Sequence, residues 1–321
     1  MIVIDATATR QALPFGPLVD ALRAQFADDR CVVPPRHVHE ISSAAGDAAL
    51  TSLIMPAWQP GAGRASYYGV KVVNIAPGNA ARGLPGLHAS YLLHDAATGV
   101  PLALIDGDEI TTRRTVAASA LAASFLARRD ARHLLVVGAG RVAALLPQAY
   151  GAVRGIERVS VWARDHRQAE RMAAGWRAQG LEAVAITDLA AAAAQADIVS
   201  CATLATTPLI QGRWLAPGSH LDLIGSFTPA MCEADDACFA GAMLYVDTDE
   251  ALRKSGDLLG PLARGVFTAA DVRGTLADLA RGRCAGRPGA AERTVFKSVG
   301  TALEDLAAAV LAYEEVVANP G

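Results

Sequence analysis

The sequence predicts an α/β protein in which a doubly wound parallel sheet is combined with a second, α+β domain. The chain has 321 residues, and at about 150 residues per domain this length predicts two domains. Short strand-like runs separated by turn residues fill most of the first third of the chain. Beyond residue 130, strand-like and helix-like segments alternate, which is typical of a parallel sheet with right-handed crossovers.

The first third is predicted to form a mostly antiparallel sheet with a helix packed against it. Residues 15–27 place their apolar side chains at helical spacing on one face. Turn signals such as Pro77-Gly78 and Thr98-Gly99 separate five strand-like runs, which are CVVPP, LTSLIMPAW, YYGVKVVNIAP, HASYLLHD and PLALIDG. A long Ala-rich helix is expected from Thr111 to Arg129.

The second part alternates between strand and helix. The expected strands are HLLVV, ERVSVWAR, LEAVAIT, DIVSCAT, SHLDLIGS and AMLYVD, and the expected helices are RVAALLPQAYGAVRG, DHRQAERMAAGWRAQG and DLAAAAAQA. Pro147 is expected to disturb the first of these helices. The amphipathic segment SVGTALEDLAAAVLAYEEVV is predicted to form a last helix that returns to the first domain. We therefore expect one domain to contain residues 1–117 and 293–321, and the other to contain residues 118–292.

The composition excludes several classes of protein. The chain is 52% apolar and 19% charged, so it can bury a large core. Its formal net charge of -3 lacks the basic footprint of a nucleic-acid binder. No apolar stretch reaches the roughly 18 residues that cross a membrane, and the N-terminal residues do not have the pattern of a signal peptide. We expect a partner that is neither a nucleic acid nor a membrane.

Neither a disulfide framework nor a metal site is expected. The five cysteines form no CxxC pair and no even-numbered set, which predicts a reduced, cytoplasmic protein. His37 and His39 have the spacing of a metal-binding pair. Two histidines without further nearby ligands are more typical of an ordinary strand, so we predict no metal.

A glycine-rich turn follows the first strand of the alternating part. It matches GxGxxA up to Ala143 and contains Gly138, Ala139, Gly140, Arg141 and Val142. In such a motif the first glycine permits a tight turn and the second permits close approach of a pyrophosphate. The helix N-terminus adds free N–H donors. The strand–turn–helix context predicts a Rossmann-type, dinucleotide-binding domain, and the alternative is a glycine turn that only packs.

The end of the next strand bears on the choice of nicotinamide cofactor. An acidic residue there would hold the ribose 2′-hydroxyl of NAD, but Ala163 and Arg164 occupy this position. Because Arg164 can pair with a 2′-phosphate, NADP(H) is favoured. NAD(H) is the alternative, since Asp165 is one residue further on. Thr203, after the strand DIVSCAT, is also expected to contact the cofactor.

Several basic residues are candidates for binding a small carboxylate. Lys71 lies within the alternating strand YYGVKVVN, where a lysine needs a counter-charge or access to a cavity. Arg36 precedes another strand, and Arg113 and Arg114 lie near the start of the Ala-rich helix. Basic groups that converge on one pocket would suit a carboxylate substrate. The alternatives are a snorkelling lysine, a surface pair and an ordinary helix face.

Several motifs, in order, resemble the ornithine cyclodeaminase/mu-crystallin family. They are YYGVKVVNIAPGN, then RGLPGLHASYLLHDAATGVPLALIDGDEITTRRTVAASALAASFLARRD, then GAG, and TVFKSVGTALEDLAAA near the C-terminus. The resemblance extends from about Pro34 to Glu314. It implies a homodimer in which Arg36, Lys71 and Arg114 bind a substrate carboxylate, with Lys71 near the reacting centre. It also implies that GAG binds the pyrophosphate and that the TVF segment, including Val295, lies near the nicotinamide.

The sequence departs from this family at one catalytic position. True ornithine cyclodeaminases have an acid/base aspartate in a Gly-Gly-Asp or Gly-Ala-Asp segment, where this sequence has Gly225-Ser226-Phe227. Phenylalanine cannot accept a proton or stabilise an ammonium group. Asp257 is a candidate substitute acid, and the alternative is that it belongs to an ordinary Gly-Asp turn.

The predicted function is therefore NAD(P)H-dependent reduction of a small α-imino acid, such as a cyclic ketimine carboxylate. Such a substrate needs a hydride and a proton but not the full cycle of ornithine deamination. Lys71 or a bound water would donate the proton. Two alternatives stay open: an ornithine cyclodeaminase, which is a lyase using NAD catalytically, and a crystallin-like protein that binds NADP(H) without turnover.

Overall fold

The computed structural model describes residues 1–42, 49–60 and 66–319. It confirms the predicted α/β class with two sheets. The chain divides into a first unit, Met1–Arg114 with Thr301–Gly321, and a second unit, Thr115–Gly300. Among the helices of these described residues, none combines the length and the apolar composition that spanning a bilayer requires.

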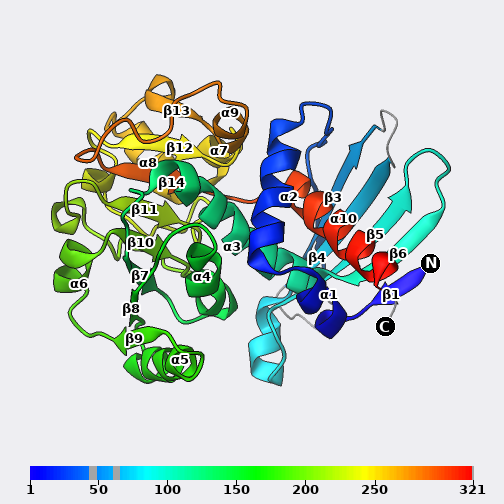
Figure 1. The fold of residues 1–321 in the computed structure, drawn as a ribbon, viewed down its shortest axis with the longest axis horizontal. Helices are drawn as coiled ribbons and strands as arrows, with labels where there is room; N and C mark the ends of the chain where they lie inside the picture. The colour runs from blue at the N-terminus through cyan, green and yellow to red at the C-terminus, as the bar shows by residue number, and fades with distance from the viewer. Residues whose placement is uncertain (43–48, 61–65, 320–321) are drawn as a thin grey trace. The chain divides into compact units, whose positions relative to one another are not determined.

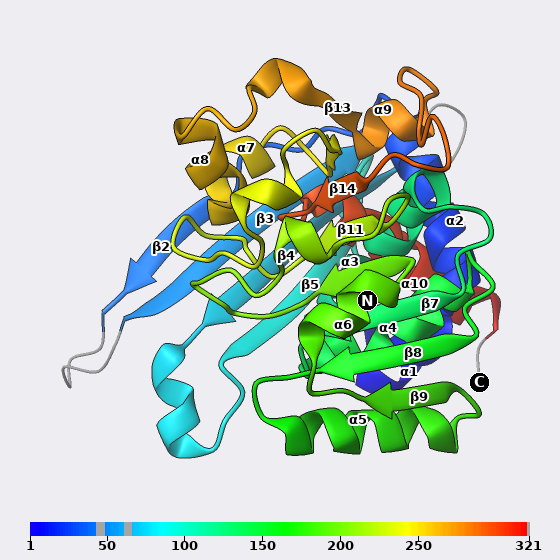
Figure 2. The same cartoon turned by 90° about the vertical axis from the view of Figure 1, so that its left-hand side faces the viewer.

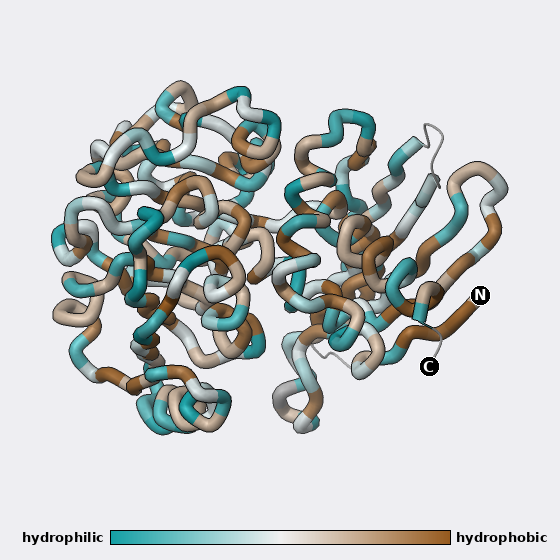
Figure 3. Tube along the Cα trace, viewed as in Figure 1, coloured by the Kyte–Doolittle hydropathy of each residue, from teal (hydrophilic) through white to brown (hydrophobic). Residues whose placement is uncertain are grey.

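The first unit is built on a six-stranded sheet. In spatial order its strands are β1 (Ile2–Ile4), β6 (Pro101–Asp106), β5 (Leu87–Asp95), β4 (Tyr67–Ile75), β3 (Leu50–Gln59) and β2 (His37–Ile41). The pairs from β2 to β6 are antiparallel, as predicted. The apolar strand β1, brown at the N-terminus in Figure 3, adds to β6 in parallel. The run CVVPP forms only an isolated bridge between Val32 and Trp58.

Three helices belong to the first unit: α1 (Ala6–Ala12), α2 (Phe15–Ala27) and α10 (Ala302–Ala318). Figure 1 shows α10 across one face of the sheet, where it contacts β3, β4 and β5, and α2 packs against α10. The apolar residues of α2 that were predicted to share a face are all buried. Side chains alternate between the faces of a strand, so Gly69, Lys71 and Val73 of β4 lie on the buried side. A 3-10 helix, η1 (Pro77–Arg82), connects β4 to β5.

Helix α3 (Gly107–Leu126) begins earlier than expected and passes from the first unit into the second. It begins at Gly107 because the Asp106 carboxylate accepts the Glu109 N–H at 2.8 Å, as an N-cap residue does. A side chain at Gly107 would meet the Ala89 backbone at 2.5 Å. This glycine therefore lets the helix begin directly against β5.

The second unit contains an eight-stranded parallel sheet. In spatial order its strands are β13 (Val272–Thr275), β12 (Met243–Val246), β14 (Thr294–Lys297), β11 (His220–Leu223), β10 (Ile198–Cys201), β7 (His133–Val137), β8 (Arg158–Trp162) and β9 (Glu182–Ala185). The connecting helices are α4 (Arg141–Gly151), α5 (His166–Ala178), α6 (Leu189–Gln195), α7 (Ala251–Lys254), α8 (Gly256–Ala263) and α9 (Leu276–Ala280). The 3-10 helices are η2 (Gly212–Trp214), η3 (Asp236–Cys238) and η4 (Ala269–Asp271). Figure 2 shows α5 beside the outer strand β9.

The order of the strands determines where a ligand can bind. The chain moves outward from β7 to β8 and β9, and then returns to β10 on the other side of β7. In open α/β sheets, ligands bind at the carboxyl ends of the strands where this reversal occurs. The crevice therefore lies at the ends of β7 and β10.

Two expectations about the chain's path are corrected. Helix α4 continues through Pro147, whose side chain is buried in the interior, although an interior proline removes one backbone hydrogen bond and crowds the carbonyl four residues earlier. The return to the first unit occurs at Thr301, not at residue 293. Strand β14 explains this difference, since it pairs with β11 and β12 in the second sheet.

Candidate active site

The glycine-rich turn begins at Gly138, directly after β7. Gly138 has a backbone φ of 123°. Residues that carry a side chain rarely adopt this backbone conformation. A Cβ at this position would lie 2.5 Å from the carbonyl oxygen of Ala202, which follows β10. The Gly138 N–H donates to the carbonyl of Trp162 at 2.8 Å. The turn is therefore fixed against both neighbouring strands.

The N-terminus of α4 presents its first turn beside Gly140. Gly140 is the N-cap residue, and no side chain caps the helix there. A Cβ at Gly140 would meet nothing within 4 Å. Ala139 and Val142 are half-buried, and Arg141 is exposed. These N–H groups and the space beside them fit a bound pyrophosphate.

The end of β8 carries the residues expected to discriminate between cofactors. Ala163 is half-buried and Arg164 is exposed. The Asp165 carboxylate is the N-cap of α5 and accepts the Arg167 N–H at 3.0 Å. The one acidic candidate for a ribose contact therefore has a structural role at this helix.

Thr203 is held by Glu233, a residue that the sequence analysis did not single out. Glu233 Oε1 accepts hydrogen bonds from the Thr203 N–H at 2.7 Å and from its hydroxyl at 2.8 Å. Its other oxygen accepts the Gly225 N–H at 2.7 Å. Burial raises the pKa of Glu233 to about 7. This carboxyl group therefore ties together the loops that follow β10 and β11.

Asp257 and Val295 are both fully buried. The Asp257 carboxylate accepts the N–H groups of Glu233 at 2.6 Å and Ala234 at 3.2 Å. The Lys297 ammonium lies 3.5 Å from its other oxygen. Val295 belongs to the hydrophobic core around β7, β10 and β11. Phe227 is 41% exposed. The catalytic role of Asp257 and the cofactor contact of Val295 stay predictions.

In the first unit, Lys71 and Arg114 meet at one buried carboxylate. Lys71 Nζ lies 2.7 Å from Asp305 Oδ1, and Arg114 Nε lies 2.8 Å from the same oxygen. Arg114 Nη1 also contacts Glu304 Oε2 at 2.5 Å. All four side chains are almost completely buried. The structure thus joins β4, α3 and α10 through these charges.

The counter-charge that a buried lysine requires is therefore Asp305, with Glu304 beside it. Burial lowers the pKa of Lys71 to about 8, although Asp305 opposes this shift. Burial acts to raise the pKa of Asp305, but Lys71 and Arg114 hold it below its usual range. An acidic pair within the otherwise apolar segment ALEDLAAA was the sequence signal for these partners.

Arg36 lies immediately before β2 and is half-buried. The sheet pairs His37 with Ile54, and Met55 with Lys71. Extending this register by one residue would align Arg36 with Met55 and Lys71. Neighbouring strands are about 4.8 Å apart, so Arg36 lies about two strand spacings from Lys71.

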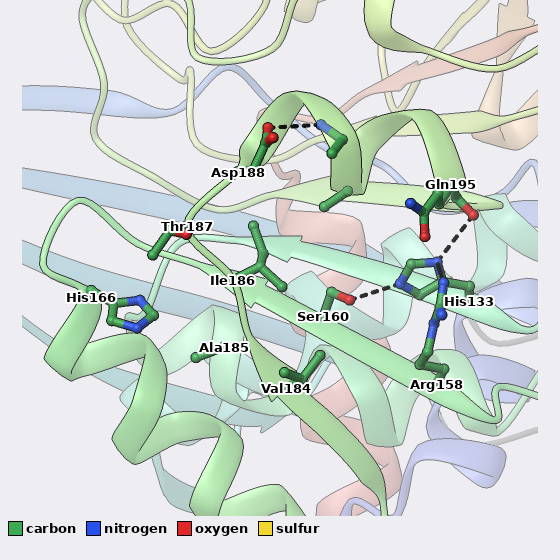
Figure 4. Close-up of a pocket in the computed structure, with 12 residues that line it drawn as sticks. His133, Arg158, Ser160, His166, Val184, Ala185, Ile186, Thr187, Asp188 and Gln195 are labelled. Atoms are coloured by element: carbon green, nitrogen blue, oxygen red, sulfur yellow. Dashed lines mark hydrogen bonds between the residues drawn. The ribbon is translucent and has the colours of Figure 1, made fainter.

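Two cavities of the second unit are lined by none of the predicted site residues. One, of about 510 Å³, is beside α6, and there His133 contacts Ser160 and the carbonyl of Gln195 (Figure 4). The other, of about 540 Å³, is rich in arginine. Its Arg154 and Arg287 donate to carbonyls near the end of α3 and so stabilise the C-terminus of that helix.

A model of the ornithine cyclodeaminase/mu-crystallin family matches residues 7–319. The chain belongs to this family. Delta(1)-pyrroline-2-carboxylate reductase of Paracoccus denitrificans (strain Pd 1222) is 48% identical over 258 residues, which cover 80% of each protein.

Two solved structures of family-like enzymes are also similar. Delta(1)-pyrroline-2-carboxylate reductase of Thermococcus litoralis, in complex with NADH and L-proline, has a TM-score of 0.92 at 31% identity, over 100% of this chain and 98% of that chain. Iminosuccinate reductase of Paracoccus denitrificans, in complex with NAD+, has a TM-score of 0.87 at 25% identity, over 99% and 97%. These matches confirm the predicted family and the prediction of an enzyme.

Proposed function

We propose that this family member reduces a cyclic α-imino acid of the Δ1-pyrroline-2-carboxylate type with a reduced nicotinamide cofactor. The observation that carries this proposal is the buried pair Lys71 and Arg114, joined at Asp305, in a chain that is 48% identical to a reductase of that substrate. Two adjacent cations suit a substrate carboxylate. Arg114 uses Nε and Nη1 on its own acidic partners, which leaves Nη2 for a substrate.

Different residues of the chain bind the substrate, donate the proton and hold the cofactor in this proposed reaction. Lys71, Arg114 and Arg36 bind and orient the carboxylate, and Lys71 donates the proton that the imine nitrogen takes up. When bound, the cofactor supplies the hydride for the imine carbon. The open N-terminus of α4 and the turn at Gly138 fit its pyrophosphate. Orientation of the substrate by several fixed groups is a large source of rate acceleration.

Phe227 favours reduction over ornithine cyclisation. A lyase must accept and return protons at the substrate's amino groups, and phenylalanine cannot do this. A ready-made imine needs only one hydride and one proton. We propose Lys71 as the proton donor and Asp257 only as the alternative acid, because the Asp257 carboxylate already accepts hydrogen bonds from two backbone N–H groups.

The test is an absorbance assay at 340 nm with NADPH or NADH and a panel of cyclic and linear imino acids, with ornithine plus NAD+ in parallel. We expect cofactor oxidation with Δ1-pyrroline-2-carboxylate. Ammonia and proline from ornithine, without net change in cofactor, would support a lyase instead. Cofactor binding without turnover of any imino acid would support a non-catalytic, crystallin-like protein.

We also propose that the cofactor is NADP(H) rather than NAD(H). Arg164 is exposed at the end of β8, and Asp165 is engaged as the N-cap of α5. Arg164→Ala is expected to weaken NADPH binding about tenfold or more, since a hydrogen bond to a charged group contributes about 1.5–3 kcal/mol, and to leave NADH binding nearly unchanged. The control is Arg167→Ala on the exposed side of α5. Equal losses for the two cofactors would contradict the preference.

We further propose a homodimer that forms through the open face of the first sheet. The register aligns Val3, Leu104, Leu92, Val70 and Pro56 in one row across five strands. Val3 is 72% exposed and Leu104 is 37% exposed. A continuous apolar row on a face that α2 and α10 do not cover is typical of an interface.

A further inference from the structure

One buried carboxylate oxygen of the first unit accepts hydrogen bonds from two cations. Asp305 Oδ1 accepts Lys71 Nζ at 2.7 Å and Arg114 Nε at 2.8 Å. These side chains come from β4, α10 and α3. Neither cation can move without giving up this shared acceptor. Glu304 also holds Arg114, but Asp305 is the residue that joins the two cations.

The groups that face Lys71 come from each element packed against it. Helix α10 contributes Asp305 and Glu304, α3 contributes Arg114, and β5 contributes Tyr91, which is paired with Lys71 in the sheet. Burial and Arg114 lower the pKa of Lys71, and Asp305 is the group that raises it most, ahead of Glu304. The ammonium form of Lys71 therefore depends chiefly on Asp305.

The cluster has polar atoms that internal contacts do not satisfy. Asp305 Oδ2 and the Tyr91 hydroxyl are buried, and neither has a hydrogen-bond partner in the described part of the chain. The Tyr91 ring crosses directly over Gly69, where a Cβ would lie 2.0 Å from its hydroxyl. Unsatisfied buried polar atoms destabilise a fold. A cluster built only for stability would not retain them.

We propose that Asp305 is a positioning residue for the reduction, which holds Lys71 and Arg114 in the orientation that binds the substrate carboxylate and keeps a transferable proton on Lys71. In the reaction, the imine carbon accepts the hydride that a reduced nicotinamide would supply, the C=N electron pair moves to nitrogen, and nitrogen takes the Lys71 proton, which solvent then restores. The expected change in the kinetics of reduction rests on the proposed function. The expected change in the protonation of Lys71 does not.

The first test follows the protonation of Lys71 directly. The chain has three lysines, Lys71, Lys254 and Lys297, so a spectrum of protein labelled with 13C at the lysine ε-carbons contains few signals, and Lys71→Arg assigns one of them. We expect Lys71 to titrate near pH 8 in the wild type. In Asp305→Asn we expect its pKa to fall by about 1–3 units, the effect of removing a nearby opposite charge.

The matched control is Glu304→Gln, which removes an equal charge from the next residue of α10. The Glu304 carboxylate contacts Arg114 rather than Lys71, so we expect Glu304→Gln to change the Lys71 titration clearly less than Asp305→Asn does. An equal change in the two variants, or none in Asp305→Asn, would overturn the proposal. This measurement needs no substrate, so its failure is distinct from a failure of the proposed function.

The second test is the pH profile of imino acid reduction. If protonated Lys71 is required, kcat/KM falls as the pH rises through its pKa. We expect this alkaline limb to move to lower pH in Asp305→Asn by the amount that the spectra show. A profile that keeps its wild-type position while Lys71 shifts would refute the role in proton supply.

Asp305→Glu decides the question if Asp305→Asn does not fold. It retains the charge but adds one methylene, so the titration of Lys71 is expected to stay close to that of the wild type. The two cations would lose their alignment, and we expect KM for the imino acid to rise about tenfold or more. A wild-type KM in this variant would exclude the positioning role.

Discussion

Gly138 shows how a single backbone angle shapes the turn that we propose binds the cofactor pyrophosphate. Its φ of 123° and the carbonyl of Ala202, 2.5 Å from a Cβ at this position, both exclude a side chain. We expect Gly138→Ala to destabilise the protein by about 1–3 kcal/mol and to weaken cofactor binding at least tenfold, because the turn must move. Thermal unfolding and NADPH titration measure the two effects.

Gly140→Ala is the matched control at the same turn. No atom lies within 4 Å of a Cβ there, so we expect an unchanged Tm. Cofactor affinity is still expected to fall, because the methyl group would occupy the space beside the α4 N-terminus. If Gly138→Ala unfolds at the wild-type temperature, the turn does not require the positive φ that favours glycine at this position.

At this scale the sequence was most informative where a residue conflicted with its surroundings. Lys71 in an apolar strand predicted either a counter-charge or access to a cavity, and the structure contains a counter-charge, Asp305. The partner could not be identified, because Asp305 is 234 positions further along the chain and only the tertiary fold brings it to β4. Glu233 gave no signal, since its role depends on two loops whose proximity is set by the order of β10 and β11.

Among the elements, the loops after β10 and β11 depend on a carboxyl group that titrates near neutral pH. Burial raises the pKa of Glu233 from its usual 4.5 to about 7, so the folded state holds this proton more tightly than the unfolded chain. The contribution to stability is therefore largest below pH 4.5 and is lost as the pH rises to about 7.

Glu233→Gln removes this titration and should flatten the curve of Tm against pH. We expect wild type to lose stability relative to the variant between about pH 5 and 7, and the difference to become constant above pH 7. Glu182→Gln, at an exposed position of β9, is the control. Parallel curves for wild type and Glu233→Gln over this range would contradict the prediction.

Elements with a clear period were predictable, and short ones were not. The helical spacing in residues 15–27 and the alternation in YYGVKVVNI correspond to α2 and β4. The segment TVFK was placed with the wrong unit, because four buried residues carry no information about their neighbours. Pattern also could not show that packing preserves α4 around Pro147.

At the scale of the whole molecule, the proposed dimer depends on the apolar row of the first sheet. Leu104→Arg would place a charge within this row, next to its end at β1, and a charge buried without a partner is strongly unfavourable. We expect this variant to sediment as a monomer where wild type is a dimer. The control is Val184→Arg on β9 of the second unit. The Val184 side chain is also partly exposed, at 46%. A dimeric Leu104→Arg would exclude this face.

The division into two sheets of different type followed from the change in sequence period near residue 130. The order of the strands did not, since period fixes which residues form a strand but not which strands become neighbours. The proposed carboxylate-binding residues of the first unit were candidates from local context and from the family resemblance, and the glycine turn of the second unit was predicted from its strand–turn–helix context. The acidic partners of Lys71 and Arg114 are brought to them by long-range packing and required the structure.

The first unit is discontinuous in the chain, and this has a consequence for synthesis on the ribosome. Helix α10 follows the whole of the second unit, which is contiguous from Thr115 to Gly300. Domains generally fold as units while the chain emerges, so the second unit can fold while β4 still lacks the helix that covers it. Until α10 has been made, Lys71 lacks Asp305, and Arg114 lacks both Asp305 and Glu304. The unit whose strands are translated first is thus completed last.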